Sequence, residues 1–401
     1  MKNKHIIVGV SGGIAAYKAV EVVSRLRKLG AEVKVVMTEN ATKFVSPMTF
    51  GEISGHPVAV KMFEDVHDWN VEHISLARWA DAYLVAPATA NVLGKMAAGI
   101  ADDMLTTQLL ATEAPIFLCP AMNTNMYENP ITQRNMNTLR ELGMHILEAD
   151  SGHLACGIVG KGRLPEPAKI VEWLSFHMMK SDLLEGKTVI VTAGGTQEAI
   201  DPVRYIGNRS SGKMGYAVAE QAALAGARTI LISAPSALPV PYGVEFVPVD
   251  SARDMEEAVN SRYEDCDAVI MAAAVADFRV ENMADTKIKK MDTLELKLVK
   301  NPDILKGLGA NKTHQKLIGF AAETQNVIEY GKSKVLNKNL DMLVANDVSK
   351  QNAGFNVDTN EVTFIYPGGQ IMQLPLMTKS DVAKRIISAL AELLFHSIIN
   401  Q

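Results

Sequence analysis

The stretch HIIVGVSGGIAAYK, residues 5–18, is a short apolar run that ends in a serine and two glycines and continues into a helical pattern. Residues 5–10 predict a strand, and the turn that follows predicts a helix beginning near Ile14. Glycines let a phosphate approach the backbone and a helix start attracts anions, but a strand-to-helix turn favours glycine in any case. The stretch therefore predicts the opening of an α/β domain and leaves phosphate binding open.

Further apolar runs alternate with helical patterns through the first half of the chain, at residues 32–37, 81–86, 115–120 and 144–149. Continuous apolar strands separated by helices predict a parallel sheet covered on both faces. Ligands of such folds bind outside the carboxyl ends of the strands. The residues just after each run are therefore the candidates for a site.

A second series of runs begins after KSDLLEGK, which places a domain boundary near residues 180–187. Its expected strands are 188–193, 229–233, 244–249, 268–273, 317–322 and 342–347. The sequence then changes character: EVTFIYPGGQIMQLPL predicts a hairpin with a Pro-Gly-Gly turn, and residues 379–395 predict an amphipathic helix. We expect two doubly wound α/β domains, at residues 1–180 and 186–401.

The composition is that of an ordinary globular protein, with 48% hydrophobic and 21% charged residues in 401. A net charge of -5 without a basic block argues against nucleic-acid binding. Cys119, Cys156 and Cys266 lack metal-ligand spacing, which favours a reducing compartment over a disulfide scaffold or zinc site. The first apolar run is too short for a signal sequence or membrane span, so we expect a cytoplasmic protein without membrane contact.

Small polar residues follow two successive runs of the first half, in PATAN and in AMNTNMYENP. Taken singly, Thr89, Asn91 and Asn123 are more readily explained as turn and capping residues than as ligands. Their coincidence at neighbouring strand ends favours a binding site.

The segments SGGIAAYK, PATAN, PAMNTNMY and ACGIVGKGRLPEP together resemble the flavin-dependent cysteine decarboxylases over most of residues 1–178. The resemblance implies a flavodoxin-like flavoprotein fold and His73, Asn123 and Cys156 as catalytic residues. It also implies noncovalent FMN held by Ser11, Gly12, Gly13, Ile14, Thr38, Thr89 and Asn91. Arg163 is a candidate for binding a substrate phosphate or carboxylate, or simply faces solvent. Leu164 stands where the family pattern has methionine, a substitution that conserves volume.

Decarboxylation of an N-acylcysteine is difficult because the carbanion would have no adjacent electron sink. Flavin can oxidise the cysteine side chain to a thioaldehyde, and carbon dioxide can then leave to give an enethiol. His73 suits a base because imidazole titrates near neutral pH, and the Asn123 amide can bind a carboxylate without adding charge.

Cys156, in the glycine-rich segment 152–162, suits the final proton donation to carbon. Without the resemblance, Cys156 is an ordinary loop thiol and His73 a helix-start histidine. Cys119 and Cys266 lie in or beside apolar runs and are expected in the core.

TAGGTQEAIDPVRYIGNRSSGKMG, residues 192–215, is a polar, glycine-rich insertion between a strand and a helix beginning near Lys213. Ser210 and Ser211 either cap that helix or help it to bind an anion. With MAAAVADF, KIKK, KNPDIL, GFAAET and YGKSKVLNKNLD, the insertion resembles the phosphopantothenate-cysteine ligase family over residues 186–398. A ligase half after a decarboxylase half matches the fused bacterial enzymes of coenzyme A biosynthesis.

The ligase resemblance implies a Rossmann-like fold, CTP as nucleotidyl donor, magnesium at Asp277, and 4'-phosphopantothenate and cysteine as the other substrates. It implies catalytic roles for Asn208 and Lys287, with Arg204, Asn208 and Ala274 binding the substrate. The implied nucleotide residues are Met271, Ala272, Ala273, Asp277, Lys287, Pro302, Asp303, Ile304, Leu305, Phe320, Lys334 and Lys338. Lys334 and Lys338 are spaced to share a helix face, which fits either a triphosphate or solvent.

Two other functions are weighed against this bifunctional enzyme. An FMN-binding regulatory protein would use the first fold without turnover, and the His73, Asn123 and Cys156 set argues against it. A tandem nicotinamide oxidoreductase lacks its expected fingerprint, since neither glycine-rich turn has the G-x-G-x-x-G spacing. The resemblance further implies a homo-oligomer, a dodecamer built from trimeric decarboxylase and dimeric ligase units.

Overall fold

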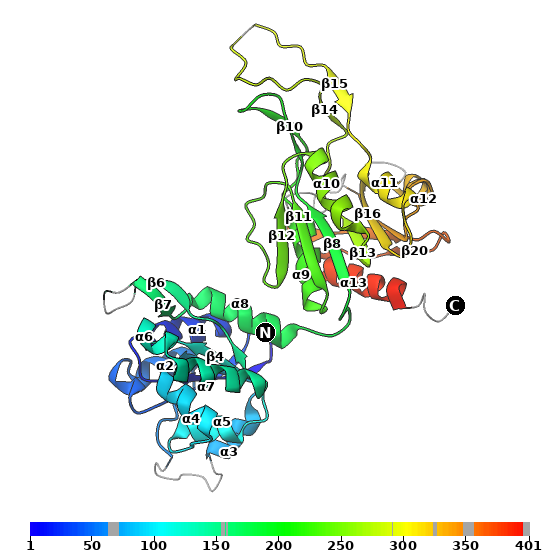
Figure 1. The fold of residues 1–401 in the computed structure, drawn as a ribbon. Helices are drawn as coiled ribbons and strands as arrows, with labels where there is room; N and C mark the ends of the chain where they lie inside the picture. Colours follow the sequence, from blue (N-terminus) through cyan, green and yellow to red (C-terminus); the bar gives the residue numbers. More distant parts are fainter. Residues whose placement is uncertain are drawn as a thin grey trace. The chain divides into compact units, whose positions relative to one another are not determined.

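The computed structural model describes residues 1–62, 72–153, 157, 159–290, 292–323, 327–347 and 357–395, without the side chains of residues 72, 73, 322, 323, 327 and 347. The chain divides into two compact units, Met1–Met179 and Lys180–Gln401 (Figure 1). Each unit is described by itself.

The first unit is built on a sheet with the order β2-β1-β3-β4-β5, in which all neighbouring strands are parallel. This is the flavodoxin-like order, so the fold predicted for the first half is confirmed. Between β1 and β3 the strand order reverses, which marks the edge where ligands of such folds bind. The strands are β1 (His5–Val10), β2 (Glu32–Met37), β3 (Ala82–Ala88), β4 (Ile116–Pro120) and β5 (His145–Ile146).

Helices cover both faces of this sheet. Leu118 packs with helices α4, α5 and α7, whereas its neighbour Phe117 contacts Trp173 of α8, because successive strand residues point to opposite faces. A hairpin of β6 (Asp150–His153) and β7 (Val159–Arg163) follows the sheet. The helices are α1 (Ala16–Lys28), α2 (Pro47–Ser54), α3 (Glu72–Trp79), α4 (Ala90–Ala98), α5 (Met104–Ala111), α6 (Thr124–Glu128), α7 (Pro130–Glu141) and α8 (Pro167–Met179), with a 3-10 turn at Ala41–Lys43.

The second unit has a mixed sheet of order β12-β11-β8-β13-β16-β17-β19-β20, parallel up to β17 and antiparallel beyond it. Its parallel part has the Rossmann order, with the reversal between β8 and β13, which confirms the predicted fold class. The strands are β8 (Thr188–Ala193), β11 (Arg228–Ser233), β12 (Val244–Pro248), β13 (Ala268–Met271), β16 (Lys316–Glu323), β17 (Met342–Asp347), β19 (Val362–Ile365) and β20 (Ile371–Gln373).

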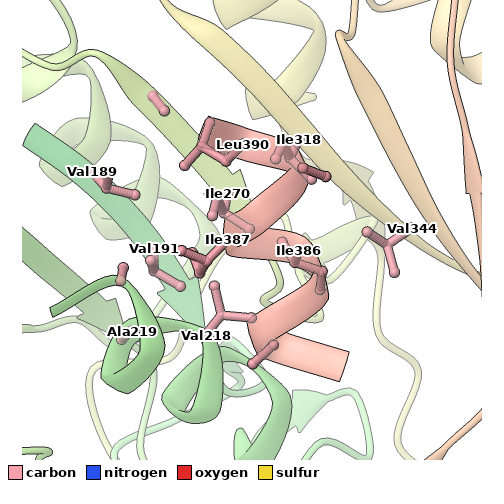
Figure 2. Close-up of a cluster of buried hydrophobic side chains, with 14 of the residues drawn as sticks. Val189, Val191, Val218, Ala219, Ile270, Ile318, Val344, Ile386, Ile387 and Leu390 are labelled. Atoms are coloured by element: carbon pink, nitrogen blue, oxygen red, sulfur yellow. The ribbon is translucent and has the colours of Figure 1, made fainter. Parts of the chain in front are cut away.

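Two cores cover the two faces of this sheet. Val189 and Val191 of β8 pack against helices α9 and α13 (Figure 2). Ile190 between them packs with α10, α11 and α12. This division follows from the alternation of side chains along a strand. The helices are α9 (Lys213–Leu224), α10 (Ala252–Tyr263), α11 (Ile304–Ala310), α12 (Val327–Asn337) and α13 (Lys379–Phe395).

Short antiparallel ribbons lie outside the main sheet, and the sequence patterns did not predict them as strands. They pair β9 (Gln197–Ala199) with β10 (Tyr205–Gly207), β14 (Phe278–Val280) with β15 (Leu298–Lys300), and β18 (Thr359–Asn360) with β21 (Met377–Thr378). The first ribbon forms within the polar insertion between β8 and α9. Asn208, directly after β10, is placed by it.

Candidate functional site

A cavity of about 1130 Å³ lies at the carboxyl ends of the first unit's strands. It is lined by residues that follow β1, β2, β3 and β4, the positions singled out from the sequence. The structure thus brings together every residue that the resemblance assigns to FMN, along with two further candidates. These lining residues are Ser11, Gly12, Gly13, Ile14, Thr38, Thr89, Asn91, Asn123 and Arg163.

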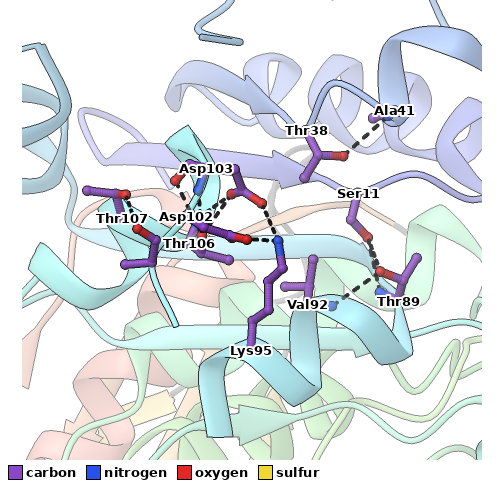
Figure 3. A network of polar contacts seen from close by, with 11 residues as sticks. Ser11, Thr38, Ala41, Thr89, Val92, Lys95, Asp102, Asp103, Thr106 and Thr107 are labelled. Carbon is purple, nitrogen blue, oxygen red and sulfur yellow. Dashed lines mark hydrogen bonds and ion pairs between the residues drawn. The ribbon is translucent and has the colours of Figure 1, made fainter. Parts of the chain in front are cut away.

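Ser11 joins the ends of β1 and β3 at the point where the strand order reverses (Figure 3). Its hydroxyl donates to the Pro87 carbonyl oxygen at 2.7 Å and accepts the Thr89 backbone N–H at 3.0 Å. The Ser11 side chain is fully buried, so it holds the floor of the cavity. Thr89 in turn caps α4 by accepting the Val92 N–H, as the capping interpretation predicts.

The start of α1 opens on the same cavity. Within the described part of the chain no side chain caps this helix, which begins at Ala16, two residues later than expected. Gly12 is required by packing, because a Cβ there would lie 2.6 Å from the Asn40 Cβ. A Cβ at Gly13 would meet only Thr89, at 3.6 Å. The uncapped N–H groups and the open Gly13 backbone give an anion room to approach.

Charged residues that the sequence patterns missed also line the cavity. Lys95 forms ion pairs with Asp102 at 2.6 Å and Asp103 at 3.1 Å (Figure 3). The hydrogen bond to Asp102 raises the pKa of Lys95, which therefore stays positive. Lys18 of α1 similarly binds Glu166, at 3.0 Å. No local pattern signals such pairs, because their partners lie on separate elements.

The β6–β7 hairpin lies directly over the loop that carries Asn123. The Met122 N–H donates to the Gly162 carbonyl oxygen at 3.0 Å, and a Cβ at Gly162 would lie 2.3 Å from the Met122 carbonyl oxygen. Asn123 caps α6 by accepting the Asn125 N–H at 2.9 Å. Arg163, at the end of β7, pairs with Glu166. The hairpin thus brings His153, Gly162 and Arg163 to the cavity wall.

The base of the hairpin is fixed by Glu148. This carboxylate accepts hydrogen bonds from Lys161 of β7 at 3.0 Å and from the Tyr127 hydroxyl, and it pairs with Arg140. Partial burial raises the pKa of Glu148, but the Tyr127 and Lys161 hydrogen bonds outweigh burial and lower it overall. The carboxylate is therefore ionised at neutral pH and can hold β7 in place.

Two catalytic candidates of the first unit are His73 and Cys156. The backbone of His73 belongs to α3, but its side chain and the whole of Cys156 lie outside the described residues. Their roles stay predictions. Cys119 and Cys266 are fully buried, which confirms that they belong to the core, and burial raises the pKa of both thiols, that of Cys266 to about 12.

The carboxyl end of β8 in the second unit holds a divided glycine turn. Gly194 has φ of +79° after β8, Gly212 has φ of +77° just before α9, and a Cβ at Gly215 would lie 2.6 Å from the Ala193 Cβ. In a dinucleotide-binding turn, glycines form the tight turn after the strand, the helix start and the close helix-strand contact. Here Gly194 forms the tight turn, and residues 195–211 separate it from Gly212 and Gly215, which form the other two features. Gly212 is the N-cap of α9, and neither Ser210 nor Ser211 caps it.

Asn208 reaches from this insertion to the segment after β13. Its side-chain amide donates to the carbonyl oxygens of Ala274 at 3.3 Å and Val275 at 3.1 Å. A cavity of about 260 Å³ lies beside Asn208 and is also lined by Gly195, which follows β8, and by Pro235, which follows β11. The structure therefore brings Asn208 and Ala274 together.

The nucleotide candidates of the ligase half occupy different environments. Met271, Ile304 and Leu305 are buried in the core, so only their backbone can face a ligand, and Phe320 packs against the other core. Asp303 caps α11 and binds Lys338 at 2.9 Å. Asp277 and Lys287 are exposed, whereas Ala272, Ala273, Pro302 and Lys334 are partly buried.

Lys338 lies just beyond α12, with its backbone N–H bonded to the Lys334 carbonyl oxygen at 3.0 Å. The two lysines are thus one helical turn apart, as their spacing predicts. Asp277 belongs to no cluster of three or more His, Cys, Asp or Glu that could bind a metal ion, since the described residues hold none. Among the same residues, no helix has the length and apolar character needed to cross a membrane.

Comparison with known proteins bears on the whole chain. Residues 1–178 match the Flavoprotein family, and residues 184–394 match the DNA/pantothenate metabolism flavoprotein C-terminal domain. The coenzyme A biosynthesis bifunctional protein CoaBC of Bacillus subtilis (strain 168) is 52% identical, over 98% of both chains. The chain belongs to the bifunctional coenzyme A biosynthesis proteins.

Two further proteins are similar to this chain. The Escherichia coli (strain K12) CoaBC protein is 45% identical over 94% of both chains. A crystal structure of the C-terminal domain of such a bifunctional protein is 45% identical, covering 53% of this chain and 98% of that chain, with a TM-score of 0.47. As a member of this family, the chain is an enzyme with a flavoprotein decarboxylase unit and a ligase unit.

Proposed function

We propose that the second unit joins cysteine to 4'-phosphopantothenate with CTP, and that the first unit decarboxylates the product with FMN to give 4'-phosphopantetheine. The decarboxylase reaction is supported by the large cavity at the strand-order reversal of the first unit, which is lined by all seven residues assigned to FMN. The ligase reaction is supported by the contact of Asn208 with Ala274 at the corresponding reversal of the other sheet. Family membership supplies the two reaction classes.

The first cavity fits FMN by its chemistry. A phosphate would lie against Gly13 and the uncapped start of α1, where the N–H groups attract anions. The exposed side chains of Ile14 and Tyr17 give the cavity an apolar wall for a flat ring system. When bound, FMN supplies a temporary acceptor for the two electrons of the cysteine side chain.

The residues around this cavity would bind and protonate the substrate. The amide nitrogen of Asn123 can donate to a substrate carboxylate, and Arg163 can offer a charge-assisted hydrogen bond. His73 is proposed as the base and Cys156 as the donor of the final proton to carbon. Because β7 lies over the Asn123 loop, the hairpin would exclude water from the carbon that loses carbon dioxide.

In the ligase unit, the substrate carboxylate would attack CTP and release pyrophosphate, leaving an acyl cytidylate. The cysteine amine would then displace CMP and form the amide. We propose that Lys287, Lys334 and Lys338 bind the phosphates and that Asn208 orients the acyl group. Magnesium at Asp277 fits a site with one carboxylate only if phosphates complete it, as is common for this ion. The remaining nucleotide residues would contribute mainly through their backbone.

The proposal also covers the oligomeric state of the protein and its location in the cell. We expect a homo-oligomer, a dodecamer of trimeric and dimeric contacts, acting on small molecules in the cytoplasm. Light scattering of the purified protein would measure its mass. A monomeric species that carries both activities would contradict the proposed assembly.

Incubation with phosphopantothenate, cysteine, magnesium and either CTP or ATP, followed by mass analysis, tests the two reactions. We expect a yellow protein that forms pyrophosphate with CTP and accumulates the saturated thiol. A Cys156→Ser variant should stop at the decarboxylated, unsaturated thiol. A colourless protein unable to take up FMN would refute the first half of the proposal. A yellow protein without turnover would instead favour the regulatory, flavin-binding role.

A further inference from the structure

Asp201 is a buried carboxylate in the turn between β9 and β10, with only 2% of its surface exposed. Its Oδ1 accepts the backbone N–H groups of Val203 at 2.8 Å and Arg204 at 2.9 Å. Its Oδ2 accepts the Arg204 Nε at 2.9 Å and the backbone N–H of Ile288 at 3.2 Å. Oδ1 therefore binds only the backbone of the local turn, whereas Oδ2 binds the Arg204 side chain and a segment distant in the sequence.

The bonds to residues 284–288 hold a segment that carries the candidate catalytic residue Lys287. Arg204 Nη2 donates to the Ile288 carbonyl oxygen at 2.8 Å, and the Ala284 N–H donates to the Ile200 carbonyl oxygen at 3.0 Å. The segment 284–288 is thus bonded to the 200–204 turn at both of its ends, at Ala284 and at Ile288. Lys287, exposed and adjacent to Ile288, has its backbone fixed by these contacts.

A turn alone does not require this arrangement. The 201–204 turn is closed by the two Oδ1 bonds, as is common for Asp side chains, and by the backbone N–H groups of Ile200 and Asp201, which donate to the Arg204 carbonyl oxygen. The Oδ2 bonds add nothing to that turn but set the plane of the Arg204 guanidinium. Arg204 Nη1 makes no hydrogen bond to any described residue, so one edge of the guanidinium is left for an anion.

We propose that Asp201 is a positioning residue for the ligase reaction, orienting Arg204 toward the substrate and holding Lys287 in reach of the nucleotide. This inference rests on the proposed function, which assigns substrate and nucleotide to Arg204 and Lys287. Asp201 itself touches neither. Its effect comes through geometry, because reacting groups displaced by about 1 Å lose much of their rate advantage.

Asp201→Asn distinguishes the turn-forming bonds of Oδ1 from the bonds that Oδ2 accepts from Arg204 and Ile288. The asparagine oxygen can still accept the two N–H groups of the turn, but its NH2 group would face the Arg204 and Ile288 donors and cannot accept from them. We expect the KM values for phosphopantothenate and CTP to rise about tenfold or more. We also expect trypsin to cleave after Lys287, Lys289 and Lys290 several times faster than in the unchanged protein.

Asp267→Asn is the matched control. Asp267 also accepts one backbone N–H, from Thr188 at 2.8 Å, and one lysine, Lys187 at 3.0 Å, but at the amino end of β8 and away from the site. It should leave both KM values and the cleavage pattern unchanged. Ile288→Pro, which lacks the N–H donor, tests the tether without altering Asp201 and should speed cleavage while raising the KM for CTP.

The outcomes separate this inference from the proposed function. If the unchanged protein forms no ligase product, the proposed function fails, and trypsin cleavage still decides whether Asp201 tethers the lysine segment. If the unchanged protein is active and Asp201→Asn keeps wild-type KM values or a wild-type cleavage rate, the positioning role is overturned. Should Asp201→Asn fail to fold, the same two measurements on Ile288→Pro decide.

Discussion

The decarboxylase cavity and the ligase site lie at corresponding places in their sheets, where the strand order reverses, yet they are built differently. In the first unit, residues at strand ends and helix starts bond to one another around about 1130 Å³. In the second, the cavity is about 260 Å³, and the candidate residues are spread over ribbons and helix ends. A site on strand ends is fixed by the sheet itself, whereas a site on ribbons depends on side-chain bonds such as those of Asp201.

The largest expected effect comes from adding a side-chain atom where α9 packs tightly against β8 in the ligase unit. Gly215→Ala would place a Cβ 2.6 Å from the Ala193 Cβ and 2.8 Å from the Thr192 carbonyl oxygen, so the helix must shift. We expect destabilisation by about 3 kcal/mol and loss of ligase activity. Urea unfolding and a pyrophosphate assay measure both.

FMN binding in the same Gly215→Ala chain should persist, because the first unit has its own core. Gly307→Ala is the control, since a Cβ in that helix meets nothing within 4 Å. It should be neutral or stabilise by up to about 1 kcal/mol. Loss of FMN binding in Gly215→Ala would show that the two sites are not built independently.

A smaller effect is expected from Ser11→Ala in the decarboxylase unit. The change leaves the Thr89 N–H and the Pro87 carbonyl oxygen without their buried partner, at a cost of about 2 kcal/mol. Because Ser11 joins β1 to β3, FMN affinity should fall as well. Chemical denaturation and flavin fluorescence titration report the two changes.

Ser175→Ala provides the comparison for Ser11. The Ser175 hydroxyl is buried in α8 and has no hydrogen-bond partner among the described residues, so its removal should be neutral or stabilising. Equal destabilisation by the two substitutions would contradict the role given to Ser11.

Lys338→Met should change function more than stability. The partly exposed ion pair with Asp303 contributes less than about 1 kcal/mol, whereas loss of a phosphate contact should raise the KM for CTP about tenfold. Steady-state kinetics and thermal unfolding separate the two. Arg228→Met removes an exposed pair with Glu245 at the start of β11 and should leave the KM unchanged. An unaltered KM in Lys338→Met would remove Lys338 from the nucleotide site.

The smallest expected effect is on acid stability. The Arg204 hydrogen bond holds the pKa of Asp201 well below its usual range. Partial burial raises the pKa of Asp103, but hydrogen bonds from Thr106 and Lys95 lower it overall. A lowered folded-state pKa stabilises the fold above the unfolded value of about 4, and this contribution is lost as the pH falls through the folded value.

Asp201→Asn and Asp103→Asn should therefore each flatten the loss of stability below about pH 4, Asp201→Asn more strongly. Denaturant unfolding at a series of acidic pH values measures the slope. A slope identical to that of the unchanged protein in both variants would show that these carboxylates titrate normally.

Much of the fold follows from local patterns. The runs 5–10, 32–37 and 188–193 form strands with those bounds, and the helix predicted at 379–395 is α13. The ribbons were missed because strands of three residues are too short to show alternation. The patterns also overestimated the run 144–149, of which only His145–Ile146 pairs with β4.

The decarboxylase site was more predictable from the sequence than the ligase site, because its residues follow the strands of one sheet. Residues after parallel strands must meet at one edge, so the motifs containing Ser11, Thr89 and Asn123 could be assigned to one cavity. Partners such as Lys95 and Asp103, or Asp201 and Ile288, lie on separate elements and leave no local signal. Only a three-dimensional arrangement reveals them.

The alternation along β8 sets a limit on how this chain can vary. Its odd-numbered residues enter one core and Ile190 the other, and Gly194 begins the turn toward α9. Substitutions affect one core at a time, but a residue inserted into or deleted from β8 would exchange the faces of everything beyond it. The strand can therefore accept substitutions far more readily than insertions or deletions.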